Sequence, residues 1–171
     1  AYRYGRGLRI LRQDAWEALA SFIVSQNNNI PRIRASVQAL SERFGERRED
    51  GEGTFFAFPT PAGLARATED ALRACGLGYR AAYIAALARE TAEGRLDLSA
   101  LCALEDESLR AALCVLNGVG PKVAQCAMLF GFHRLAAFPV DTWIRRALAT
   151  RYPQGFPLER YAGCGGVIQQ Y

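Results

Sequence analysis

Features that would assign this chain to a membrane, secreted or metal-binding class are missing from its sequence. Half of the 171 residues are hydrophobic, yet no apolar run reaches the roughly 18 to 20 residues of a membrane-spanning helix, so we expect no membrane partner. No Cys-x-x-Cys pair occurs, which argues against a disulfide framework, a zinc site and an iron–sulfur cluster. We therefore expect a reducing cytoplasm, no cofactor and no metal held by side chains. The scattered cysteines are Cys75, Cys102, Cys114, Cys126 and Cys164.

A large excess of charge is also missing. The net charge is +4, which permits a polyanionic partner without demanding one. A short basic group is more often a solvated helix face than a binding site, so charge alone assigns no function. The short basic groups are Arg32 with Arg34, Arg43 with Arg47 and Arg48, and Arg145 with Arg146.

Alternating strand patterns are nearly absent, whereas helical periodicity is present along most of the chain. Trp16, Leu19 and Ile23 fall on one stripe of a helix that Asp14 caps. The segment TFFAFP is too short and too uniformly apolar to predict a strand. Further helices are predicted before Gly45, after Thr60, after Thr68, between the break CGLGYR and about Glu93, and over about 105–115, 121–132 and 142–152. These segments predict an all-α fold of about eight helices.

The predicted helices follow one another through short connections. We expect residues 1–171 to form a single helical domain, with a helix-hairpin-helix at about 105–132. Residues 153–171 are rich in glycine and poor in periodicity, so they predict no element. The sequence does not start with Met, which is compatible both with a whole protein after processing and with a fragment of a longer chain.

The segment LNGVGPKVAQC contains a lysine, a residue that is scarce in this sequence. Gly118 and Gly120 suit a tight turn whose backbone N–H groups can approach a phosphate, and Pro121 suits the first helical position. An ordinary helix–turn–helix corner has the same glycines. Lys122, however, lies at the positive end of the next helix, which disfavours an ammonium and favours the neutral amine that attacks carbon.

An aspartate in the segment PVDT completes a candidate catalytic pair. Asp141 is predicted to be the N-cap of the following helix, where an aspartate is usually structural. An N-cap also favours an ionised carboxylate, which can face a cation that develops during a reaction. The amine of Lys122 and this carboxylate suit chemistry at the C1′ atom of a sugar.

These segments resemble those of the helix-hairpin-helix DNA glycosylases. The runs LRQDAWEALASFIVSQNNNIPRI and CGLGYRAAYI make the chain similar to the 8-oxoguanine DNA glycosylases, from about Gly7 to Tyr152. The resemblance implies that Lys122 attacks C1′, expels the oxidised base and forms a Schiff base, after which β-elimination cuts the strand. It implies that Asp141 stabilises the cationic transition state. The family's amino-terminal β domain is missing from this sequence.

The resemblance also implies roles around the extruded base. Cys126 would line the base pocket and Phe130 would stack near it. A buried core thiol explains Cys126 equally well, and ordinary helix packing explains Phe130 better than the stacking role does. The run QNNN could simply cap and turn the chain. By resemblance, Asn27 lies near the cytosine left opposite the lesion, and Tyr79 fills the gap in the duplex.

Further contacts with DNA are implied by the same resemblance. Arg32 and Arg80 would hydrogen-bond the unpaired cytosine. The backbone of Gly118, Val119 and Gly120 would hold a phosphate, and a monovalent cation would bind the carbonyls of Cys114, Leu116 and Val119. Gln169 and Gln170 are candidates for recognising the base, but their spacing assigns neither, and Trp143 stands where some relatives have histidine.

The implied protein is a monomeric base-excision repair enzyme, both DNA N-glycosylase and AP lyase, that acts on damaged double-stranded DNA. It would work in the cytoplasm at the nucleoid if bacterial, and in the nucleus if eukaryotic. Two alternatives stay open: a glycosylase of the same superfamily for another damaged base, and a non-catalytic helix-hairpin-helix module that only grips phosphates. A module of that kind needs neither Lys122 nor Asp141.

Overall fold

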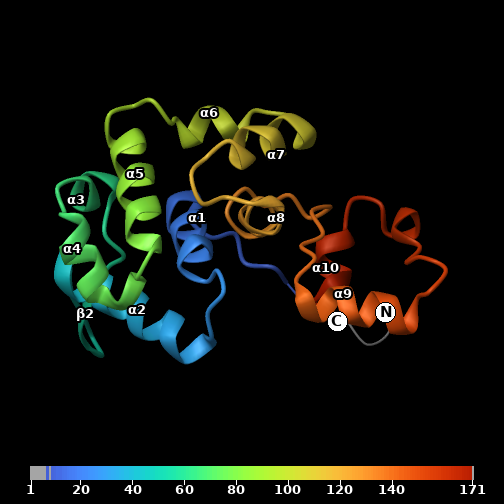
Figure 1. The fold of residues 1–171 in the computed structure, drawn as a ribbon, viewed down its shortest axis with the longest axis horizontal. Coiled ribbons are helices and arrows are strands. Elements are labelled where there is room, and N and C mark those ends of the chain that lie inside the picture. The colour runs from blue at the N-terminus through green and yellow to red at the C-terminus, as the bar shows by residue number, and fades with distance from the viewer. Residues whose placement is uncertain (1–6, 8, 171) are drawn as a thin grey trace.

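Helices form most of the structure, a computed structural model that describes residues 7 and 9–170 (Figure 1). The α-helices are α1 (Ala15–Val24), α2 (Ile30–Phe44), α3 (Pro61–Ala65), α4 (Glu69–Leu72), α5 (Arg80–Ala92), α6 (Leu98–Cys102), α7 (Asp106–Cys114), α8 (Pro121–Phe130), α9 (Thr142–Arg151) and α10 (Gly165–Gln169). A π-helical turn, η1, spans Arg73–Leu77, and a 3-10 turn, η2, spans Leu158–Tyr161. The prediction of an all-α fold is therefore confirmed.

Two of these helices were not predicted, so the expected number of about eight is too low. Helices α6 and α10 have five residues each, which is too short to show a helical period. Helix α10 and η2 lie within residues 153–171, the part that predicted no element. The expected caps are present: the side chains of Asp14, Thr60, Thr68 and Asp141 each accept a hydrogen bond from the backbone N–H three residues later.

The prediction that TFFAFP forms no strand is wrong. Strand β1 (Arg47–Asp50) pairs antiparallel with β2 (Gly53–Phe56), so the chain makes a small hairpin between α2 and α3. Every residue of both strands is exposed, so neither strand has the alternation of buried and exposed residues that a sequence pattern reveals. The break predicted at CGLGYR is confirmed, because Gly76 has a φ of 79° inside η1.

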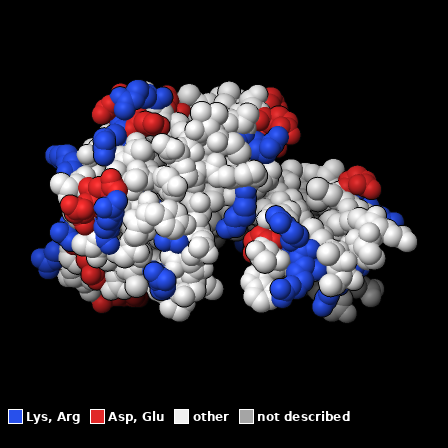
Figure 2. Space-filling model, viewed as in Figure 1, with Lys and Arg blue, Asp and Glu red and all other residues white. Residues whose placement is uncertain are grey.

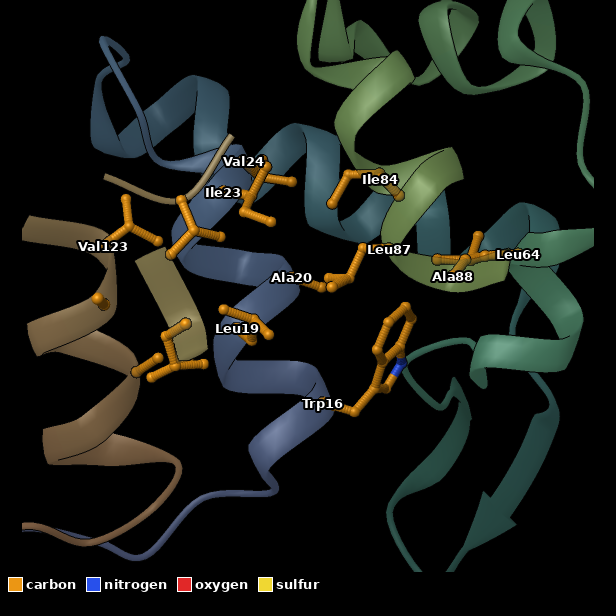
Figure 3. Packing of buried hydrophobic residues seen from close by; sticks show 14 of the residues in the cluster. Trp16, Leu19, Ala20, Ile23, Val24, Leu64, Ile84, Leu87, Ala88 and Val123 are labelled. Atoms are coloured by element: carbon orange, nitrogen blue, oxygen red, sulfur yellow. The ribbon is translucent and has the colours of Figure 1, made fainter. Parts of the chain in front are cut away.

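Helix α1 occupies the centre of the core, between α8 on one side and α5 with α3 on the other (Figures 1 and 3). Leu19, Ile23 and Val24 are completely buried, and Trp16 donates from its indole nitrogen to the carbonyl of Pro59 at 2.8 Å. Figure 3 shows Val123 of α8 near the end of α1 that carries Ile23 and Val24. The core thus fixes the start of α8 against the end of α1.

Helices α9 and α10 lie on the other side of α8 from α2 to α5 (Figure 1). In the part of the chain that the structure describes, no helix is both long and apolar enough to cross a membrane.

Candidate active site

A cleft of about 580 Å³ opens where the turn after α1, the start of α8 and the start of α9 approach one another. Figure 2 shows this face hollowed between the main helical body and the part that contains α9, with basic side chains over α9. The cleft is lined by Ser25, Gln26, Asn27, Asn28, Tyr79, Gly120, Pro121, Lys122, Val123, Val140, Asp141, Thr142, Trp143 and Arg145. Segments far apart in sequence therefore meet at one site.

The turn between α7 and α8 has the tight geometry that its glycines predicted. Gly118 has a φ of 78°, and a Cβ atom built on it would lie 2.5 Å from the ring of Tyr83. No other residue fits that position without moving the ring. Gly120 is exposed and lines the cleft, whereas Val119 is 5% exposed and its N–H donates to the Leu116 carbonyl. The Val119 N–H is therefore already bonded within the turn.

Lys122 lies in the first turn of α8, directly after Pro121, and is half-buried. Its Nζ atom is 5.5 Å from the centre of the Phe22 ring, and that ring stacks on Phe130 with centres 5.5 Å apart. The amine therefore has an aromatic wall from α1 on one side and the open cleft on the other. Phe130 contacts Phe22 and does not line the cleft itself.

Asp141 caps α9 and faces the same cleft as Lys122. Its Oδ1 atom accepts the N–H of Ile144 at 2.7 Å, which orients the half-buried carboxylate. The N-terminus of a ten-residue helix stabilises this negative charge. The carboxylate is thus fixed where a positive charge in the cleft would be stabilised.

Cys126 lies one helical turn after Lys122 and is buried at 4% exposure. Burial raises the pKa of its thiol, the charge and hydrogen bond of Lys122 lower it, and the charge of Asp141 raises it. These influences mean that Cys126 lies close to both groups. Burial is the largest of them, so the residue is a neutral thiol beneath the cleft.

The residues expected to contact the opposite strand fall into different environments. Asn27 and Tyr79 both line the cleft, Tyr79 is 52% exposed, and Asn27 has a φ of 44°. Arg32 is exposed on the first turn of α2 but does not line the cleft. Its position leaves the guanidinium accessible to a ligand.

Arg80 is buried, with 5% of its surface exposed. Four of the five guanidinium N–H groups point at backbone carbonyls, those of Gln26, Asn27 and Leu77. The guanidinium also lies 4.5 Å from the centre of the Tyr79 ring. A contact between Arg80 and a DNA base stays a prediction, and it requires some of these carbonyls to be released.

The predicted cation site at the end of α7 is chemically compatible with the structure. The Leu116 carbonyl accepts the N–H of Val119 at 3.0 Å, and a carbonyl oxygen keeps a second lone pair for another partner. Cys114 ends α7, where carbonyls lack the N–H partners of a helix interior. Binding of a cation there stays a prediction.

Several cleft residues were not predicted from the sequence as site residues. Trp143 is 73% exposed, and the guanidinium of Arg146 lies 5.4 Å from its ring centre. Arg145 lines the cleft beside it. The sequence did contain a signal for these residues: they lie two to five positions after the candidate catalytic Asp141, in the first turns of the same helix. Gln26 gave no such signal, because its partner Gly118 is 92 residues away in the chain.

Comparison with known proteins places this chain in a family. Residues 20–153 match the family described as HhH-GPD superfamily base excision DNA repair protein. The chain is 43% identical over 155 residues to the N-glycosylase/DNA lyase OGG1 of Arabidopsis thaliana, covering 88% of this chain and 42% of that protein. It is 40% identical over 159 residues to the N-glycosylase/DNA lyase of Saccharomyces cerevisiae, covering 86% and 42%.

A solved structure of a similar protein has the same fold. The apo-form of Clostridium acetobutylicum 8-oxoguanine glycosylase/lyase superposes with a TM-score of 0.92 at 37% identity, covering 99% of this chain and 63% of that one. The chain thus spans less than half of the two eukaryotic proteins and under two thirds of the bacterial one. Because the family match extends from α1 to the end of α9, the chain belongs to the HhH-GPD superfamily of base excision DNA repair proteins.

Proposed function

We propose that this chain removes 8-oxoguanine from duplex DNA opposite cytosine and then cuts the strand as an AP lyase. The observation that carries the proposal is the meeting of Lys122 and Asp141 in one cleft, each at the N-terminus of a helix. The Clostridium acetobutylicum 8-oxoguanine glycosylase/lyase in complex with double-stranded DNA containing cytosine opposite 8-oxoG superposes on this chain with a TM-score of 0.90. That likeness supports the choice of lesion and of opposite base.

In the proposed reaction, the neutral amine of Lys122 attacks C1′ while the bond from C1′ to the base breaks. The base leaves with the bonding electrons and takes up a proton. Asp141 stabilises the positive charge that develops on the sugar. The lysine nitrogen loses one proton, the sugar ring opens as the bond from C1′ to O4′ breaks, and O4′ takes up a proton, which leaves a protonated imine between C1′ and the lysine nitrogen. Removal of a proton from C2′ then expels the phosphate at C3′, which cuts the strand.

The surroundings of the amine suit this chemistry. Lys122 lines the open cleft, with its amine beside the Phe22 ring and close to the buried thiol of Cys126, so the amine can reach a substrate that enters the cleft. Tyr79 is exposed at the edge of the cleft and can fill the gap that extrusion leaves in the duplex. Arg32 presents donors to the unpaired cytosine, which offers acceptors.

Borohydride trapping tests the proposal. Borohydride reduces an imine to a stable amine, so wild-type protein should become covalently attached to a duplex with 8-oxoguanine opposite cytosine. Lys122 is the only lysine in the sequence, so Lys122→Gln should abolish trapping. Peptide mapping of the product should place the adduct on residue 122.

The outcomes separate the proposal from its alternatives. Trapping on a duplex with another damaged base, but not on 8-oxoguanine, would assign a different substrate. Tight binding of duplex DNA without trapping on any lesion would favour the non-catalytic module. Trapping that persists in Lys122→Gln would move the nucleophile to another amine.

A further inference from the structure

Gln26 connects segments that approach the cleft from three directions. It lies in the turn between α1 and α2, and its side-chain Nε2 donates to the Gly118 carbonyl at 2.7 Å and to the Ile23 carbonyl at 3.2 Å. Its own carbonyl accepts from Nε of Arg80 at 2.8 Å. One residue therefore joins the turn after α1, the start of α5 and the turn between α7 and α8. Here, 'the hairpin' means that α7–α8 turn.

The hairpin is held at the same point by a second contact. The Tyr83 ring lies against Gly118, where a Cβ atom would come within 2.5 Å of it, and Tyr83 meets Tyr79 edge to face with ring centres 6.0 Å apart. Gly118 is thus fixed through its carbonyl by Gln26 and through its α-carbon by Tyr83. Lys122 follows four positions later, in the first turn of α8, so the placement of Gly118 sets the placement of the amine.

Gln26 also fixes the loop that faces the opposite strand. Asn27 has a φ of 44°, a conformation that costs free energy for a residue with a side chain. Its carbonyl and that of Gln26 are both bonded to Arg80, whose side chain is buried next to Tyr79. The loop and the ring that would fill the duplex gap are therefore tied to the residue that holds the hairpin.

We propose that Gln26 is a positioning residue. It holds the α7–α8 turn, and with it Lys122, at a fixed distance from the Asn27 loop and Tyr79, which would contact the opposite strand. The inference rests on the proposed function, because it concerns the placement of the proposed nucleophile. An amine that attacks carbon has to start about 3 to 3.5 Å from it, and a misplacement of about 1 Å costs about a hundredfold in rate. Gln26 acts through the hairpin, without contacting the reacting atoms.

The test is Gln26→Met, which keeps the length of the side chain and removes its donor. With enzyme in excess, base release from 8-oxoguanine opposite cytosine should slow by about tenfold to a hundredfold. The Kd for duplex DNA should stay within about twofold, because a positioning residue acts on the chemical step and not on binding. The melting temperature should remain close to that of wild type.

A matched control comes from Gln38 on α2, which is exposed and donates to Glu42 at 2.7 Å. Gln38→Met makes the same chemical change far from Gly118 and should leave the rate unchanged. Gln26→Glu keeps the shape of the side chain and replaces the donor with an acceptor, so it should slow base release at least as much as Gln26→Met. It also provides a second variant if Gln26→Met does not fold.

Base release at the wild-type rate in both Gln26 variants would overturn the inference. The inference would also be overturned if every variant with slower base release also had a higher Kd for DNA or a lower melting temperature. That pattern would mean that the Gln26 bond only supports the fold or the binding of DNA. Trapping on a duplex with a preformed abasic site separates this result from a failure of the proposed substrate. On that duplex imine formation still depends on where the hairpin places Lys122, even if wild type does not excise 8-oxoguanine.

Discussion

The hairpin β1–β2 and helix α9 both carry adjacent arginines, but only those of the hairpin are paired with carboxylates. Arg47 lies 2.8 Å from Glu49, and Arg48 lies 3.0 Å from Glu46. Among residues 9–170, no carboxylate lies within ion-pairing distance of Arg145 or Arg146. The sequence shows two similar pairs of arginines, but in the structure only the pair on α9 lacks carboxylate partners among the described residues. We therefore expect the α9 pair to be the more available to a phosphate.

The hairpin β1–β2 and helix α9 also each contain an aspartate that accepts backbone N–H groups. Asp50 accepts from Glu52 and Gly53 at the turn of the hairpin, just as Asp141 accepts from Ile144 at the start of α9. All three bonds are local and structural. Asp141 alone lines the cleft that contains Lys122, so position in the fold, and not hydrogen bonding, separates a proposed catalytic aspartate from a turn residue.

The largest expected effect is that of Asp141→Asn, with Asp50→Asn as its matched control. Asp141→Asn keeps an N-cap but removes the charge that would face the sugar cation, so base release should slow by about a hundredfold to a thousandfold. Asp50→Asn should leave the rate unchanged. Single-turnover excision measures both, and similar rates for the two variants would return Asp141 to a purely structural role.

A smaller effect is expected for recognition of the opposite base. Arg32 is exposed and carries only donors, so it should favour cytosine over adenine opposite the lesion. Arg32→Ala should reduce this preference by about tenfold to a hundredfold, the discrimination of a good bidentate contact. Arg34→Ala, two positions further along α2, is the control. The measurement is excision of 8-oxoguanine opposite each base, and unchanged preference in Arg32→Ala would remove this role.

The smallest effect is expected when each of the two arginine pairs is neutralised in turn. Arg145→Gln with Arg146→Gln should weaken duplex binding and lower the slope of log Kd against log salt by about 0.9 for each phosphate that these arginines neutralise in the wild type. Arg47→Gln with Arg48→Gln removes the same charge from the hairpin and should change neither quantity. Salt titrations of duplex binding test both variants. Equal effects in the two variants would mean that the pairing with glutamates does not withhold the hairpin arginines from DNA.

Local chemistry made much of the fold predictable from sequence. The four caps follow from side chains that reach backbone N–H groups three residues away, and the turn before α8 follows from glycine and proline. The two catalytic candidates were predictable for the same reason, since a lysine and an aspartate at helix N-termini are unusual as a pair. These signals depend only on neighbours in the chain.

Features that depend on distant partners were not predictable. From the sequence, Arg80 was expected to be an exposed donor beside Tyr79. Its guanidinium is instead buried against the carbonyls of Gln26 and Asn27, more than fifty positions earlier in the chain. The bond from Gln26 to Gly118 likewise joins opposite halves of the chain. The strands β1 and β2 were missed for another reason: they pair with each other across a short turn, but because every residue in them is exposed they have no hydrophobic pattern.

The two tryptophans give the protein a built-in optical readout. Trp16 is 7% exposed and hydrogen-bonded in the core, whereas Trp143 is 73% exposed at the mouth of the cleft. Emission from a buried indole lies at shorter wavelength than emission from a hydrated one. The intrinsic fluorescence of this chain therefore divides into a component that follows unfolding and a component that follows occupancy of the cleft.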